Sequence, residues 1–206
     1  MTELVAIVMA SGFSRRMGRN KLLLPLGRET VISHVLKIIE SVDYAGTIVV
    51  SQYPEVLALA EKQGFFAVEN HSSQEGKSSS IRSGLLLLKD LQKAGRLPQR
   101  AGAVFFTADQ IFLSREFLLR LKEEFLRRPE SMVFPAYGGK PGSPGAFPEE
   151  RFAELMELAG EEGGMAIARR YPEQLILVAA ESELEGYDFD TWEEWERALA
   201  LWRNRQ

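Results

Sequence analysis

Small and cationic residues are concentrated in one stretch, Ala10–Leu24, which reads ASGFSRRMGRNKLLL. Gly12 and Gly18 allow backbone N–H groups to come close to an anion. The basic side chains add positive charge, and Arg offers a planar fork for phosphate oxygens. The spacing is neither that of a Walker A loop nor that of a dinucleotide-binding G-x-G-x-x-G loop. The stretch predicts a binding loop for a polyphosphate; the alternative is a basic surface turn.

Apolar runs alternate with segments of helical periodicity along the chain, beginning with Leu4–Met9 just before this loop. This alternation predicts an α/β fold, with a mostly parallel sheet and helices on both faces. Ligands of such sheets bind at the carboxyl ends of the strands, where the loop lies. Strands are expected at 4–9, 46–50, 65–69, 103–107, 132–136 and 174–179, and helices at 30–42, 54–63, 78–91, 114–127, 149–158, 165–171 and 191–203.

Two segments of the second half have a distinctive composition. Residues 137–147 contain four Gly and two Pro, which predicts a loop or hairpin beside the sheet. The last predicted helix carries a stripe of large side chains that is expected to dock it on the rest of the fold. The stripe consists of Trp192, Trp195, Leu199 and Trp202.

Composition excludes several function classes. The 206 residues, 45% of them hydrophobic and 26% charged, are expected to form a single domain, 1–206. The net charge of −4 argues against nucleic-acid binding, and no apolar run approaches the ~18 residues of a membrane helix. The absence of Cys excludes disulfides and thiolate nucleophiles. The first ten residues lack the basic start of a signal peptide, so we expect a cytoplasmic protein.

The loop and four later blocks resemble one family. Met9–Lys21 resembles the signature L-A-A-G-x-S-x-R-M-G-x-x-K of the MobA-like nucleotidyltransferases, and within them most resembles the molybdenum-cofactor cytidylyltransferases. Asn70–Leu85 is similar to the family's N…G-x-S-S-S-l-r-x-G-L block, and Thr107–Gln110 to its block around G-D. Gly139–Pro141 resembles its G-H-P turn, and Asp188–Thr191 its closing D-I-D-T.

This resemblance implies a Rossmann-like fold of the nucleotide-diphospho-sugar transferase type. It implies transfer of a nucleotidyl group from an NTP to a phosphate, with release of pyrophosphate. The catalytic residues would be Arg16, on the β- and γ-phosphates, and Lys21, on the α-phosphate. Mg²⁺ takes one or two carboxylates, for which we expect Asp109 and Asp190, although Asp190 is also placed to cap the last helix. The expected nucleotide-binding residues are Ala10, Ser11, Gly12, Ser14, Ser78, Ser79, Ser80 and Arg82.

The base and the acceptor also follow from the resemblance. Ser11-Gly12 stands where guanylyl-transferring relatives usually carry Gly-Gly, so we expect CTP as donor, phosphorylated molybdopterin as acceptor and a molybdoenzyme as client. The alternatives are guanylyl transfer to the same cofactor and cytidylyl transfer to another phosphorylated acceptor. A third alternative is a non-catalytic protein that binds the molybdenum cofactor. It is favoured by Ile111 in place of Pro and Lys140 in place of His in the family blocks.

Overall fold

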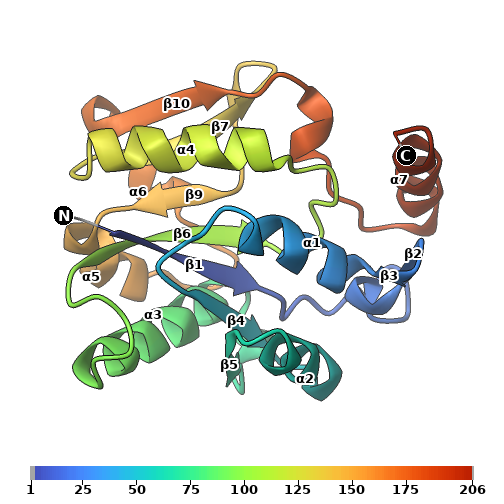
Figure 1. Cartoon of the computed structure of the whole chain (residues 1–206), viewed down its shortest axis with the longest axis horizontal. Helices are drawn as coiled ribbons and strands as arrows, with labels where there is room; N and C mark the ends of the chain where they lie inside the picture. Colours follow the sequence, from blue (N-terminus) through green and yellow to red (C-terminus); the bar gives the residue numbers. More distant parts are fainter. Residues whose placement is uncertain (1–2, 206) are drawn as a thin grey trace.

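The computed structural model describes residues 3–205, in which an eight-stranded sheet forms the centre of the molecule (Figure 1). The strand order is β10-β7-β9-β6-β1-β4-β5, and β8 pairs with β7 beside this path. A two-stranded hairpin lies apart from the sheet. The sheet strands are β1 Glu3–Met9, β4 Thr47–Ser51, β5 Phe66–Glu69, β6 Ala101–Thr107, β7 Met132–Tyr137, β8 Lys140–Pro141, β9 Gly145–Phe147 and β10 Leu175–Ala179; the hairpin is β2 Pro25–Leu26 with β3 Glu29–Thr30.

Most neighbours in the sheet are parallel. β1 pairs in parallel with β4 and β6, β4 with β5, and β7 with β10. The exceptions are β9, which runs antiparallel to both β6 and β7, and the short β8, antiparallel to β7. The carboxyl ends of β1, β4, β5 and β6 therefore meet at one edge of the sheet, and the segments that follow these strands are brought together there.

Helices cover both faces of the sheet, as the sequence predicts. Side chains of α1 Val31–Glu40, α2 Pro54–Lys62, α4 Arg115–Arg127 and α7 Trp192–Arg203 belong to one core. Side chains of α3 Lys77–Lys93, α5 Phe152–Met156 and α6 Met165–Ala168 belong to the other. No helix within residues 3–205 is long and apolar enough to cross a lipid bilayer.

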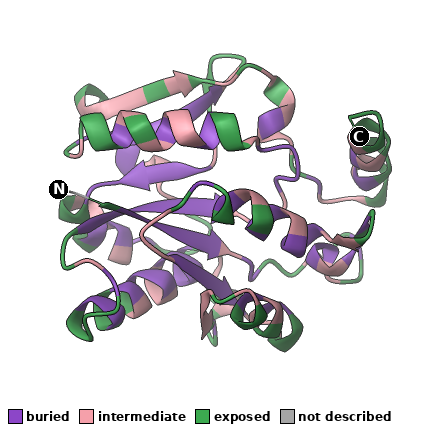
Figure 2. Ribbon diagram, viewed as in Figure 1, coloured by how far each residue is buried: buried purple, intermediate pink, exposed green. Residues whose placement is uncertain are grey.

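Strand β1 shows how the sequence divides between these two cores. Its burial is nearly complete from Leu4 to Val8, and Figure 2 shows the central strands as buried. Because successive side chains of a strand point to opposite faces, Leu4, Ala6 and Val8 enter one core, whereas Val5 and Ile7 enter the other. A run of apolar residues without alternation is what a strand covered on both faces requires.

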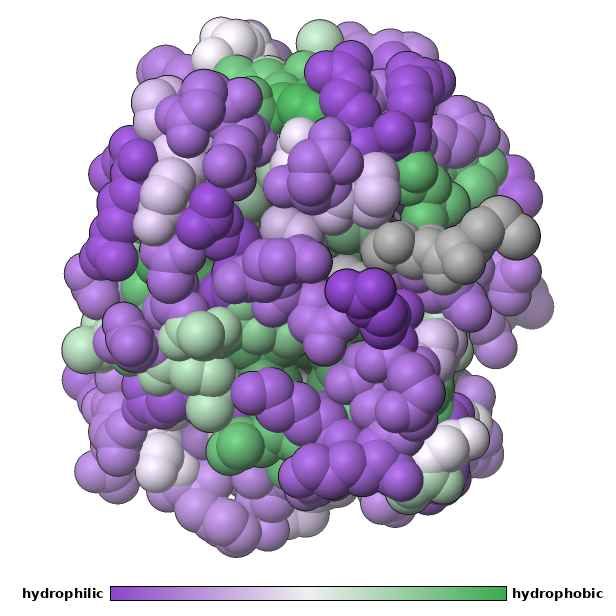
Figure 3. Space-filling model, turned by 90° about the vertical axis from the view of Figure 1, so that its left-hand side faces the viewer, coloured by the Kyte–Doolittle hydropathy of each residue, from purple (hydrophilic) through white to green (hydrophobic). Residues whose placement is uncertain are grey.

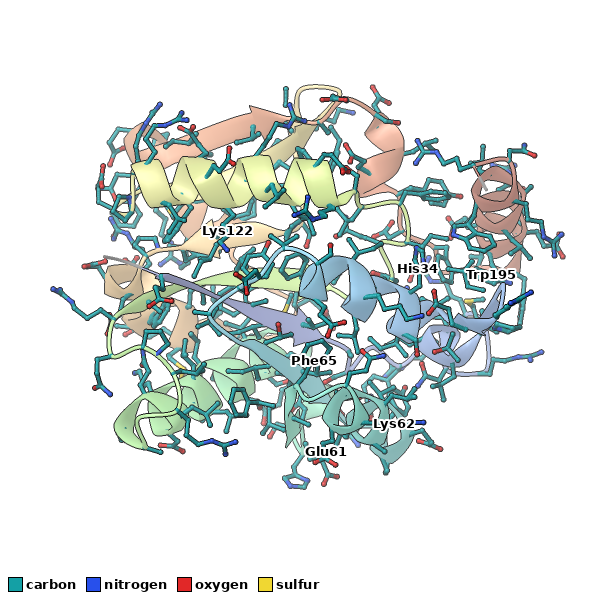
Figure 4. All side chains as sticks on the ribbon, in the orientation of Figure 1. His34, Glu61, Lys62, Phe65, Lys122 and Trp195 are labelled. Carbon is teal, nitrogen blue, oxygen red and sulfur yellow. The ribbon has the colours of Figure 1, made fainter. Side chains whose placement is uncertain are left out.

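Helix ends follow local side-chain chemistry. The Thr30 hydroxyl accepts from the Ser33 N–H and caps α1, and Ser114 caps α4 in the same way. α7 begins with a capping box, in which Thr191 accepts from the Glu194 N–H and Glu194 accepts from the Thr191 N–H. Lys122 of α4 donates to the Val42 carbonyl at 3.1 Å, which ties α4 to the end of α1 (Figure 4).

The structure changes some predicted elements. The predicted helix 149–158 is a 3-10 turn at Glu149–Arg151 followed by the short α5, and the helix predicted at 165–171 ends at Ala168. Residues 137–147 form β8 and β9, and β9 is inserted into the sheet between β7 and β6. Such an insertion depends on pairing with β6, which is distant in the sequence, and residue periodicity does not reveal this pairing.

The tryptophans of α7 lie on one face of the helix, as predicted, and each contacts a different neighbour. Trp195 is buried and lies 4.8 Å, between ring centroids, from Phe189. Trp202 packs edge-on to His34 of α1. Trp192 is 37% exposed and donates from Nε1 to the Met17 carbonyl. Helix α7 is thus fastened to α1 and to the loop after β1, and it carries the residues before it to that loop.

Candidate active site

A cavity of about 550 Å³ opens at the carboxyl ends of β1 and β6. This is the edge at which α/β sheets bind ligands, and the volume lies within the ~300–1,000 Å³ of small-molecule sites. The opposite side of the molecule, at the amino ends of β1 and β6, is mainly hydrophilic with small separate apolar patches (Figure 3). The predicted site residues that line the cavity are Ala10, Ser11, Gly12, Ser14, Arg16, Lys21, Ser80, Asp109 and Asp190.

Ser14 holds the loop after β1 in its shape. Its backbone adopts φ of 49°, a left-handed conformation that a non-Gly residue rarely takes. The Ser14 hydroxyl accepts from the Lys21 N–H at 3.1 Å, and its carbonyl accepts from the N–H groups of Met17 and Gly18. The loop therefore folds back on Ser14, which places Arg16 and Lys21 on the same cavity.

Lys21 lies at the centre of the site. Its side chain is 10% exposed, and Nζ lies 2.5 Å from Asp109 Oδ2, 2.7 Å from Asp190 Oδ1 and 2.6 Å from the Phe189 carbonyl oxygen. Three acceptors thus take the three protons of the ammonium group. Burial alone would lower the pKa of Lys21, but Asp109 and Asp190 outweigh it and hold that pKa above its ordinary value. The side chain is therefore a permanent cation at neutral pH.

Arg16 reaches the same acidic group from the outside. Its guanidinium donates to Asp190 Oδ2 at 2.8 Å and is 67% exposed at the cavity rim. The hydrogen bond from Lys21 is the main reason that the pKa of Asp190 is lowered, and Arg16 adds to this effect. Asp190 therefore stays ionised, and it links the two cationic residues of the loop to the start of α7.

Asp109 presents an unused oxygen next to Lys21. It follows the end of β6 after Ala108 and is 13% exposed, with Oδ2 on Lys21. Its other oxygen, Oδ1, is buried and has no hydrogen-bond partner within residues 3–205. A buried carboxylate oxygen without a donor is costly. Together with Asp190 it supplies the oxygen ligands that Mg²⁺ prefers.

A third carboxylate, Asp188, also lines the cavity. Desolvation, and then the negative charge of Asp109, raise its pKa. Across residues 3–205 the acidic side chains form no group of three arranged around a common metal position. A dication held here would therefore depend on ligand oxygens and water for the rest of its coordination shell, as Mg²⁺ commonly does.

The start of α3 is only partly at the cavity. Ser80 lines it, whereas Ser78 and Ser79 are buried outside its wall. Arg82, predicted to bind the nucleotide, instead donates to the Leu158 carbonyl at 2.7 Å and pairs with Glu75 at 2.5 Å. The structure therefore does not bring Ser78, Ser79 and Arg82 to the ligand space. Arg82 lies in the second turn of α3, on the side covered by the segment after α5. Its guanidinium therefore bonds to the Leu158 carbonyl of that segment and not to the cavity.

Other lining residues were not expected from the sequence. Some lie next to recognised blocks, where proximity in the sequence was a usable signal: Phe13, Arg15, Gly76 and Lys77. Glu161 gave no such signal. It reaches the cavity because Gly160 packs on Gly76, so closely that a Cβ on Gly76 would lie 2.6 Å from the Gly160 carbonyl oxygen. Gly76 has φ of 88°, which an L side chain rarely adopts.

Comparison with solved structures supports the same architecture. A homologue, from Mycobacterium sp. strain JC1, of the Mycobacterium tuberculosis protein Rv0371c is 25% identical, with a TM-score of 0.83 over 98% of each chain. The molybdopterin-guanine dinucleotide biosynthesis protein A of Archaeoglobus fulgidus is 16% identical, with a TM-score of 0.73 over 97% of this chain and 99% of that one. CMP:2-keto-3-deoxy-manno-octonic acid synthetase, solved with CTP, is 14% identical, with a TM-score of 0.72 over 100% of each chain.

The family itself is established by sequence. No curated protein matches the chain closely enough to count as a relative. The model of the MobA-like NTP transferase domain matches residues 6–175, which include the loop after β1, the start of α3 and Asp109. The expected family and fold are confirmed. A match over this much of the chain, joined to a basic loop and a carboxylate pair at the carboxyl edge of the sheet, shows that the chain is a nucleotidyltransferase of the MobA-like NTP transferase family.

Proposed function

We propose that the chain transfers CMP from CTP to the phosphate of a molybdopterin-type acceptor and releases pyrophosphate. The observation that supports it best is the Lys21 ammonium, which two carboxylates hold at the base of a cavity rimmed by Arg15 and Arg16. Binding of a triphosphate requires this concentration of fixed positive charge. The carboxylates supply a place for the dication that normally accompanies a triphosphate.

The chemistry needs positioning more than proton transfer. The attacking phosphate oxygen of the acceptor is already ionised near pH 7, so no general base is required. A bond forms between that oxygen and the α-phosphorus. The bond from the α-phosphorus to the bridging oxygen breaks, and pyrophosphate leaves with the electron pair. Negative charge increases at the α-phosphate and on the leaving group during this step.

The loop residues would neutralise that charge. Lys21 exchanges one carboxylate partner for an α-phosphate oxygen, which the flexible ammonium allows because its donors rotate freely. Arg16, exposed at the rim, binds the β- and γ-phosphates through its planar fork. Asp109 and Asp190 would hold Mg²⁺, which neutralises negative charge on the triphosphate when bound. The structural feature that favours this assignment is Asp109 Oδ1, which has no partner in the described part of the chain.

Similarity to solved structures and to the family's sequence pattern supports the choice of CTP and of a molybdopterin acceptor. The solved synthetase that binds CTP shares this fold, and the Archaeoglobus fulgidus protein acts in molybdopterin-guanine dinucleotide biosynthesis. Ser11-Gly12 in place of Gly-Gly favours cytidine over guanosine. The acceptor would lie beside the β7–β8 turn, where Lys140 is exposed at the end of the sheet.

The test is a reaction panel. The purified chain is incubated with molybdopterin, Mg²⁺ and each NTP separately, and pyrophosphate and the product mass are measured. We expect pyrophosphate with CTP and a product heavier than molybdopterin by one CMP group. Pyrophosphate release with GTP and not with CTP would show that the chain transfers a guanylyl group instead of a cytidylyl group. Binding of molybdopterin without pyrophosphate release from any NTP would show a cofactor-binding accessory protein and refute the proposal.

A further inference from the structure

A buried amide organises the hydroxyl groups beside the cavity. Asn70 comes directly after β5 at the carboxyl edge of the sheet, and its side chain is nearly inaccessible, with the residue 2% exposed. Its backbone N–H donates to the Ser51 carbonyl, which fixes the main chain. Asn70 itself does not line the cavity, whereas its neighbours Ser11 and Ser80 do. Any effect of Asn70 on a ligand must therefore pass through them.

The orientation of the Asn70 amide is determined by its partners. Oδ1 accepts from the Ser72 N–H at 3.1 Å, and a backbone N–H can only donate. Nδ2 therefore points the other way, where three hydroxyl oxygens lie at hydrogen-bonding distance. These are Ser79 Oγ at 2.9 Å, Ser80 Oγ at 3.1 Å and Ser11 Oγ at 3.3 Å. All three hydroxyls face an amide nitrogen that only donates.

The protons of these hydroxyls are not equivalent. Ser79 donates its proton to the Gly76 carbonyl at 2.7 Å, and Ser11 donates to the Val50 carbonyl at 3.3 Å. Ser80 accepts from Asn70, and within residues 3–205 its hydroxyl donates to no protein acceptor. Since Ser80 lines the cavity, its O–H is the donor left for a ligand atom.

We propose that Asn70 is a positioning residue for nucleotide binding, which fixes Ser80 as a hydrogen-bond donor to an acceptor atom on the base. This inference rests on the proposed function and deepens it. Ring nitrogens and carbonyl oxygens of the base are the acceptor atoms that such a donor recognises. By donating to Ser80, Asn70 prevents that hydroxyl from turning its proton inward, so the orientation is set before the ligand arrives. A preoriented donor binds more tightly than a free rotor, because no ordering cost remains.

The discriminating substitution is Asn70→Asp, which keeps the shape and reverses the hydrogen bonding. The substituted carboxylate can accept from the Ser72 N–H and from the neighbouring hydroxyls, so the fold is retained. The Ser80 proton then points toward the carboxylate, and only oxygen lone pairs face the ligand. Gln92→Glu is the matched control. Gln92 is a buried amide at the other end of α3 that donates to the Pro98 carbonyl, remote from the cavity lining.

Binding of CTP with Mg²⁺ is measured by calorimetry for the wild type, Asn70→Asp, Ser80→Ala and the double variant. We expect Ser80→Ala to weaken binding about 5–30-fold, the effect of one lost hydrogen bond to a buried partner. Asn70→Asp should weaken it about as much or more. When Ser80 is already Ala, adding Asn70→Asp should raise the Kd for CTP less than about twofold further, because the effect of Asn70 passes through the Ser80 hydroxyl. The KM for CTP should rise with kcat nearly unchanged, and Gln92→Glu should leave the Kd unchanged.

Two results would overturn the inference. If Asn70→Asp weakened CTP binding equally in the wild type and in Ser80→Ala, its effect would come from the added charge or from lost stability and not from the Ser80 hydroxyl. Unchanged binding by Asn70→Asp would show that the hydroxyl orientation does not matter. Failure of the proposed function gives a different result, since the wild type itself would then release no heat with CTP, GTP, ATP or UTP, and the inference would fall with it.

Discussion

Replacement of Lys21 by Met tests the central ion cluster. The substitution keeps an unbranched side chain of similar length and removes the ammonium that lies within 2.7 Å of Asp109, Asp190 and the Phe189 carbonyl. Two effects follow together. The triphosphate loses its deepest cation, and two carboxylates are left with less compensating charge.

The magnitudes come from the same geometry. Loss of one preorganised group at a developing charge costs about 10²–10³ in turnover. Removal of one partner from a buried ion pair costs about 3–5 kcal/mol, and the lower end applies because Asp190 is 48% exposed. About 3 kcal/mol corresponds to a decrease in Tm of roughly 6–12 °C for a chain of this length. Lys21→Met should therefore remain folded at 25 °C with little activity.

The assay measures pyrophosphate release at saturating nucleotide, together with thermal unfolding. Lys93→Met is the control, because Lys93 forms an exposed pair with Asp90 at 3.4 Å, which contributes less than about 1 kcal/mol. The variant Lys21→Met with Asp190→Asn should regain stability but not activity, because it removes one unpaired charge and restores no cation. A folded Lys21→Met protein with a turnover within about tenfold of wild type would refute the assigned role.

Three further substitutions test other parts of the site. Asp109→Asn should weaken Mn²⁺ binding at least about tenfold by calorimetry, whereas the exposed Asp90→Asn should not; equal affinities would remove Asp109 from the metal site. The lowered pKa of Asp190 stabilises the fold at neutral pH, and this contribution is lost as the pH falls below 3.8 and through the lowered pKa. Asp190→Asn should therefore flatten the acid side of a plot of Tm against pH, and an unchanged slope would contradict the pairing with Lys21. Gly76→Ala should lower the stability by about 2 kcal/mol in chemical denaturation, more than Gly64→Ala. Both glycines have positive φ, but only the Cβ at position 76 would meet backbone atoms, at 2.6 Å; equal losses would mean that the contact with Gly160 is unimportant.

The cluster around Lys21 also explains how a distant segment becomes part of the site. Phe189 and Asp190 lie 168 and 169 residues from Lys21 in the chain. They reach it because α7 docks through Trp195 on Phe189 and through Trp192 on the Met17 carbonyl. A substitution that loosens α7 should therefore act on catalysis as well as on stability.

The sequence by itself determined the α/β class, most strands and the loop that carries Arg16 and Lys21. These features are local, since hydrophobic periodicity, small residues and charge are properties of neighbours along the chain. Asp109 was also predictable, because it lies just past the end of an apolar strand whose carboxyl end faces the ligand edge.

Only the tertiary structure decided which side chains share the cavity and which are taken by other partners. Arg82 matched a family block, but its guanidinium donates to the carbonyl of Leu158, which lies 76 residues away in the chain. Asn70 opens a family block, but its contacts with Ser79, Ser80 and Ser11 form only where β5, the start of α3 and the loop after β1 meet. The sequence likewise did not predict that β9 enters the sheet or that Gly160 packs on Gly76. Such contacts depend on how whole elements pack, and the energies that choose between packings are sums over many distant pairs.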